Sequence, residues 1–169
     1  MNIFVLDEDP IVSANDYNSK HQVKMVLELA QQLSTAHHLC GSNTDLSKLY
    51  KATHVHHPCV KWVCETTENY KWAYKHFVEL CNAFERDFGK THKTSRLIEY
   101  LKTIPNIPQG NLTPFAQAMD DVYKSTDPVI SYWLYYVIDK DHLAQWKNKE
   151  IPYWYEYLSE FISPNIEEL

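Results

Sequence analysis

The chain opens on an apolar run that stops at an acidic turn. Residues 2–6 read NIFVL, and the turn that follows contains Asp7, Glu8, Asp9 and Pro10. A run this short, bounded by turn residues, predicts an extended segment that packs on the core and need not pair into a sheet.

The longest helical pattern follows this segment. Ser13 with Asp16 three residues later resembles a capping box, and helical periodicity continues to about His38 before Gly41 ends it. At 100° per residue, the side expected to face the core carries Val23, Val26, Leu27, Ala30 and Leu33. The opposite, polar side carries His21, Lys24, Glu28, Gln31 and Thr35.

A second long helix is predicted over residues 68–88. Thr66 or Thr67 caps its start, and Gly89 ends it. The side expected to be buried carries Tyr70, Ala73, Tyr74, Phe77, Cys81 and Phe84.

Shorter helical patterns complete the chain. They are a turn at 46–50, a turn beginning at Pro58, and helices over 95–103, 114–124, 128–146 and 153–162. Because no strand pattern recurs, the sequence predicts an all-α fold, a compact bundle of about five to six helices forming a single domain over residues 1–169.

Composition narrows the function classes. The net charge is −6, and only two of the 16 basic residues are arginine, which is unfavourable for non-specific contact with DNA or RNA. No apolar run approaches the roughly 20 residues of a membrane-spanning helix, so we expect no membrane partner. The four cysteines lack C-x-x-C spacing, and no secretory signal precedes them, which favours reduced thiols and a cytoplasmic location.

The polar side of the first long helix is the main candidate for chemistry. His21, Lys24 and Glu28 lie within one narrow sector, where they could converge on a ligand or form a solvated face. In glycosidic bond hydrolysis, a carboxylate stabilises the developing positive charge while an acid protonates the leaving group. Glu28 and His21 suit these roles, and Lys24 suits an amine nucleophile. Asp120 and Asp121 are weaker carboxylate candidates.

A histidine-rich turn, THVHHPC at residues 53–59, is the second candidate. His54 with His57, or His56 with Cys59, has spacing that a zinc ion can use if further ligands come from elsewhere. Such a turn before proline is more typical of a hydrogen-bonded loop or a substrate-contact surface. We therefore expect no metal and no other cofactor.

Three segments carry a family resemblance: SKHQVKMVLELAQQLSTAHH, THVHHPCVKW and ENYKWAYKHFVELCNAFERDFG. Over most of the chain they resemble a phage-encoded protein family of uncharacterised function. More distantly, the order of parts, ending in IPYWYEY, is similar to the phage pyrimidine-dimer DNA glycosylases. That resemblance implies a compact helical fold and a mechanism in which the N-terminal α-amine attacks the sugar carbon while a helix glutamate assists.

The chain departs from the glycosylase pattern at its expected catalytic positions. His21 stands where the resemblance places the glutamate, and Glu28 lies further along the helix. Asn2 is a poor context for removing Met1, so a free α-amine on Asn2 is not expected. The basic DNA-binding surface of that family is also missing.

Three functions follow as hypotheses. The first is an N-glycosidase acting on a base in DNA or on a smaller nucleotide, which the acidic charge favours. The second is a non-catalytic phage protein that sequesters a nucleotide defence signal, and the third is a histidine-based metal-dependent hydrolase. Residues expected to contact the substrate are Asn2, Gln31, Thr35, His54, His57 and Trp62.

Overall fold

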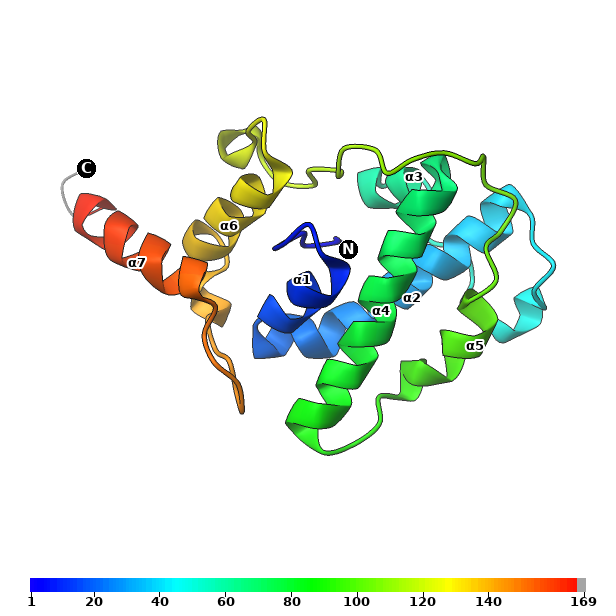
Figure 1. The fold of residues 1–169 in the computed structure, drawn as a ribbon, viewed down its shortest axis with the longest axis horizontal. Helices are drawn as coiled ribbons and strands as arrows, with labels where there is room; N and C mark the ends of the chain where they lie inside the picture. Colours follow the sequence, from blue (N-terminus) through cyan, green and yellow to red (C-terminus); the bar gives the residue numbers. More distant parts are fainter. Residues whose placement is uncertain (167–169) are drawn as a thin grey trace.

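The structure is a computed structural model that describes residues 1–166, with side chains to residue 162. The described residues form seven α-helices, four short 3₁₀ turns and no strand, so the all-α class is confirmed and the helix count is slightly higher than expected (Figure 1). The helices are α1 (Pro10–Asp16), α2 (Ser19–Cys40), α3 (Pro58–Glu65), α4 (Thr67–Phe88), α5 (Ile98–Leu101), α6 (Pro128–Ile138) and α7 (Tyr153–Ile166).

Helices α2 and α4, each of 22 residues, form the centre of the fold. They cross one another, α1 and α3 pack against them, and α6 with α7 forms a separate pair beside them (Figure 1). Helix α4 has the predicted ends: the Thr66 hydroxyl accepts a hydrogen bond from the Asn69 amide, and Gly89 ends the helix with φ +68°. That conformation strains residues with a Cβ atom, which explains the glycine.

The predicted start of the first long helix was wrong. The chain breaks at Tyr17, and the side chain of Asn18 caps α2 by accepting from the His21 amide at 2.9 Å. Ser13 lies inside α1, where its buried hydroxyl accepts from the Leu6 amide and donates to the Phe4 carbonyl. Ser13 therefore holds the N-terminal segment instead of capping a helix.

Residues 2–6 form the expected extended segment, and all five are buried. Backbone groups of this segment form hydrogen bonds with side chains, whereas in a sheet they would bond to a neighbouring strand. The Phe4 amide donates to the Tyr17 hydroxyl at 2.9 Å, and the Leu6 carbonyl accepts from the indole of Trp133 at 2.7 Å. Because buried backbone groups need partners, these bonds allow a lone segment to lie within a helical core.

Helix α2 is buried around most of its circumference, which the two-sided pattern did not predict. Val23 and Leu27 were expected in the core but are 42% and 37% exposed. On the other side, Gln32 and Thr35 are fully buried. The reason is that the N-terminal segment and the loop after α2 cover the side that the polar pattern assigned to solvent, as the bonds from Gln32 to Asn2 and from Thr35 to Thr53 show.

Three of the shorter predicted helices differ from the structure. Residues 114–124 contain only a 3₁₀ turn at Asp121–Tyr123, residues 95–103 divide into a 3₁₀ turn (Lys93–Leu97) and α5, and α6 stops at Ile138. The long loop between α5 and α6 passes over α3 (Figure 1). Tertiary hydrogen bonds hold these stretches, for example from the Trp146 indole to the Asp16 carbonyl and from the Tyr132 hydroxyl to the Ala116 carbonyl.

No helix within residues 1–166 combines the length and the apolar character that crossing a lipid bilayer requires.

Candidate functional site

The two amines nearest to Glu28 come from opposite directions. The Met1 α-amine lies 3.5 Å from Glu28 Oε2, and the Lys24 ammonium lies 3.3 Å from Oε1. The Glu28 side chain is 13% exposed, whereas Lys24 is 66% exposed. Glu28 Oε2 has no hydrogen-bond partner among the described residues beyond this ion pair. We call Met1, Lys24 and Glu28 the N-terminal site.

Asn2 fixes the position of the Met1 amine. Its side-chain amide donates to the Ala118 carbonyl at 2.8 Å, and its Oδ1 accepts from the Tyr132 hydroxyl at 3.0 Å. Its backbone carbonyl accepts from the Gln32 side chain at 3.2 Å. Asn2, expected as a substrate contact, is buried by these bonds and acts in the structure as an anchor for its neighbour.

His57 borders the N-terminal site from the loop before α3. It caps α3, because its Nδ1 accepts from the Cys59 amide at 3.1 Å. Burial, and next the positive charge of the Met1 amine, lower the pKa of His57, so the neutral imidazole is favoured beside this amine. His54 and His56 are exposed, and His54 bonds to its neighbour Thr53.

His21 lies in the aromatic core. Its ring stacks on Phe4 with centroids 4.3 Å apart, and its Nδ1 shares a 2.7 Å hydrogen bond with the Tyr136 hydroxyl. Burial lowers the pKa of His21 to about 3, so the ring is neutral near pH 7. No contact joins His21 to Glu28 among the described residues, so the structure does not bring this expected acid–base pair together.

The other residues expected to contact the substrate lie in different parts of the fold. Thr35 is buried and holds the loop after α2, accepting from the Thr53 amide at 3.1 Å. Trp62 packs edge-on against Trp72 and donates to the Thr113 carbonyl. Gln31 is half-buried on α2, and Asp120 and Asp121 are exposed. Only Lys24, Glu28 and His57 of the expected residues therefore meet at the N-terminal site.

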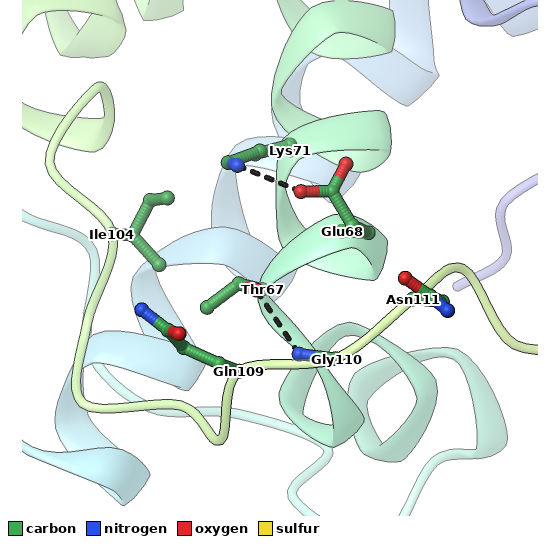
Figure 2. Close-up of a pocket in the computed structure, with 7 residues that line it drawn as sticks. All are labelled: Thr67, Glu68, Lys71, Ile104, Gln109, Gly110 and Asn111. Atoms are coloured by element: carbon green, nitrogen blue, oxygen red, sulfur yellow. Dashed lines mark hydrogen bonds and ion pairs between the residues drawn. The ribbon is translucent and has the colours of Figure 1, made fainter.

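A cavity of about 390 Å³ lies at the start of α4 (Figure 2). Several of its polar groups already have partners within the protein: Glu68 pairs with Lys71 at 2.7 Å, and the Gly110 amide donates to the Thr67 hydroxyl. The Thr67 amide donates to the Pro108 carbonyl. Among the described residues of this lining, the side-chain amides of Gln109 and Asn111 remain without a partner, and the charged groups are paired with each other.

The histidines and cysteines do not gather into a ligand set. Within the part of the chain that the structure describes, no group of three or more His, Cys, Asp or Glu side chains lies close enough to hold a metal ion. His37 instead bonds to the hydroxyls of Ser42 and Tyr70. His38 bonds to the Tyr50 carbonyl.

Comparison of the chain with models of known protein families, with curated proteins and with solved structures finds no significant match.

The ion pair between the Met1 amine and Glu28 is the feature of the candidate site that sequence reasoning missed. The sequence pattern assigned the amine nucleophile to Lys24 and gave no free α-amine on Asn2, and no spacing rule connects residue 1 with residue 28. One signal was present: an apolar run that begins at residue 2 and is buried must carry the preceding amine into the fold with it.

Proposed function

We propose that this protein is an N-glycosidase-like protein that releases a nucleobase from a small nucleotide or from DNA. The observation that supports the proposal is the Met1 amine 3.5 Å from the mostly buried carboxylate of Glu28. An amine nucleophile beside a carboxylate is the pair that such a reaction needs. The resemblance to the phage pyrimidine-dimer glycosylases implies the same kind of pair, although His21 stands where it places the glutamate; in this proposal Glu28 takes the acidic role and Met1 supplies the amine.

The chemistry follows from these two groups. The Met1 ammonium, paired with Glu28, first gives up one proton to water. The lone pair of the neutral nitrogen then bonds to the sugar C1′ while the bond from C1′ to the base breaks, and the base leaves with that electron pair and takes up a proton. The Glu28 carboxylate stabilises the positive charge that develops on the sugar. The nitrogen then loses both of its protons as the C1′–O4′ bond breaks and O4′ takes up a proton, and water hydrolyses the resulting imine to regenerate the amine.

Lys24 is the alternative nucleophile. Its ammonium lies 3.3 Å from the other oxygen of Glu28, but its side chain is largely exposed. The Met1 amine is held by the bonds of Asn2, whereas no comparable bonds from the described residues order Lys24. We therefore assign the nucleophile to Met1 and leave Lys24 as a contact for the substrate.

The net charge of −6 favours a small substrate over a long polyanion. The test is to incubate the purified protein with nucleotides and with damaged or modified DNA, and to measure base release by chromatography. Borohydride added during the reaction reduces the imine and leaves the sugar on the protein, where mass spectrometry locates it. Glu28→Gln should slow release at least about 100-fold, because a positioned carboxylate contributes on this scale.

Two variants distinguish the amines, and one controls for loss of a carboxylate. A single glycine added before Met1 displaces the α-amine and should abolish the adduct, whereas Lys24→Met should retain it. Glu68→Gln removes an exposed carboxylate on α4 and should leave the rate unchanged. Absence of base release from every substrate would refute the enzymatic proposal, and recovery of an intact bound nucleotide would favour sequestration instead.

A further inference from the structure

A second cavity, of about 420 Å³, lies at the start of α2. Three segments form it: the first turns of α2, the last residue of α4 and the loop before α7. The residues that line it are Ser19, Lys20, Val23, Lys24, Phe88, Gln145 and Lys147. We call it the lysine-rimmed cavity, and its volume is in the range of small-molecule sites in proteins.

The lining of the lysine-rimmed cavity is apolar with a positive rim. Val23 and Phe88 supply apolar surface, and Val23 remains 42% exposed although it is a large apolar side chain. Lys20, Lys24 and Lys147 supply the charge, and none of the described residues that line the cavity carries a carboxylate. Among residues 1–162, neither Lys20 nor Lys147 has an ion-pair partner. A ligand that fits this lining combines a flat apolar part with an anion.

The walls of this cavity are fixed by hydrogen bonds. The Ser19 amide donates to the Gln145 carbonyl, and the Lys147 amide donates to the Ser19 hydroxyl, each at 2.7 Å. The indole of Trp146, between these two loop residues, donates to the Asp16 carbonyl. The loop is therefore held against α2 before any ligand arrives, which reduces the ordering cost of binding.

The cavity adjoins the N-terminal site through one side chain. Lys24 lines the cavity, and its ammonium reaches Glu28. A molecule bound in the cavity is thus within one lysine side chain of the proposed reacting groups.

We infer that the lysine-rimmed cavity binds a free nucleoside monophosphate. The base lies on Val23 and Phe88, the phosphate lies between Lys20 and Lys147, and the sugar lies toward Lys24. This inference rests on the proposed function, for which it names the substrate class as a single nucleotide instead of a nucleic acid strand. One phosphate suits two unpaired lysines, whereas the chain carries a net charge of −6 and few basic residues to follow a strand.

The test is calorimetric titration with the 5′-monophosphates of adenosine, guanosine, cytidine and uridine, and with the matching nucleosides. At least one monophosphate should bind, and its nucleoside should bind more than about tenfold more weakly. Lys20→Gln and Lys147→Gln should each weaken binding about fivefold, a modest effect because both side chains are exposed. Val23→Asp, which places a carboxylate on the cavity wall, should abolish binding.

The control is Lys102→Gln, which removes an exposed lysine just after α5 and should not change binding. The inference is overturned if no monophosphate binds, if neither Lys20→Gln nor Lys147→Gln weakens binding, or if only oligonucleotides bind.

Glu28→Gln separates the inference from the proposed function. This variant should bind the monophosphate at least as tightly as the wild type, because Lys24 in the cavity wall loses its ion-pair partner, while losing base release. If the wild type binds the monophosphate in a lysine-dependent way but releases no base, the inferred nucleotide site is supported and the proposed glycosidase function is refuted. If base is released and its KM is unchanged by Lys20→Gln and Lys147→Gln, the glycosidase function is supported and the inferred nucleotide site is refuted.

Discussion

His76 makes the fold sensitive to acid through a fully buried hydrogen-bond chain. Its Nδ1 donates to the Pro10 carbonyl at 2.8 Å, so the neutral ring presents Nε2 as an acceptor for the Tyr17 hydroxyl at 2.9 Å. The Tyr17 oxygen in turn accepts from the Phe4 amide. Protonating Nε2 removes the acceptor that Tyr17 uses, and the buried charge has no carboxylate beside it among the groups that shift its pKa.

The size and sign of the effect follow from the pKa values in the two states. Burial lowers the pKa of His76 to about 4 in the folded protein, whereas it is about 6.5 in the unfolded chain. Between these values the unfolded state binds a proton that the folded state does not. Stability is therefore complete above pH 6.5 and falls as the pH drops toward 4. Between pH 7.5 and pH 4.5, His76 alone should remove about 2 to 3 kcal/mol from the free energy of unfolding.

The assay is urea unfolding followed by tryptophan fluorescence at pH 7.5 and pH 4.5, for the wild type and His76→Gln. The variant should be less stable at pH 7.5 by about 1 to 3 kcal/mol because buried bonds are lost. Its loss of stability between the two pH values should be smaller than that of the wild type by about 2 to 3 kcal/mol. His56→Gln, at an exposed histidine, is the control. Equal losses in the wild type and His76→Gln would refute the reasoning.

Three further substitutions test the packing and the helix ends by the same urea titration at pH 7.5. Leu29→Ala should lower the free energy of unfolding by about 3 kcal/mol, because Leu29 is 1% exposed and its removal leaves a cavity; a loss below 1 kcal/mol would mean that α2 is not packed as described. Asn18→Ala should cost about 1 kcal/mol by removing the cap of α2, and an unchanged midpoint would contradict that role. Gly89→Ala should also cost about 1 kcal/mol, entirely through its φ of +68°, since a Cβ there meets no atom within 4 Å; a more stable variant would show that the backbone relaxes.

The ends of helices were predictable where the signal is local. Thr66 and Gly89 act on backbone groups within one turn of themselves, so the sequence alone indicates where α4 begins and ends. The end of α6 was not predictable, because the aromatic pattern continues to Trp146 while the chain leaves the helix at Ile138. What redirects it is a set of bonds to α1 and α2, about 130 residues earlier, that no local pattern reveals.

The candidate site also combines contacts that a local sequence pattern predicts with contacts that only the assembled fold creates. The pair of Lys24 and Glu28 is a local i,i+4 relation that the helical period predicts, and the structure contains it. The period also placed His21 beside them, but the ring of Phe4 stacks on His21 and holds it in the core. The approach of Met1 to Glu28 depends on how the N-terminal segment crosses α2, which is a property of the assembled fold.

The N-terminal segment also sets the order in which the chain assembles. Its partners Ala118, Tyr132 and Trp133 lie 116 to 130 residues further along the chain. At 5 to 20 residues per second, a ribosome takes on the order of ten seconds to synthesise the chain from this segment to these partners. During this time the apolar side chains of residues 2–6 stay exposed, because the residues that bury them do not yet exist. Contacts of this range also slow folding after release. Residues 2–6 are thus among the last parts of the fold to reach their native place.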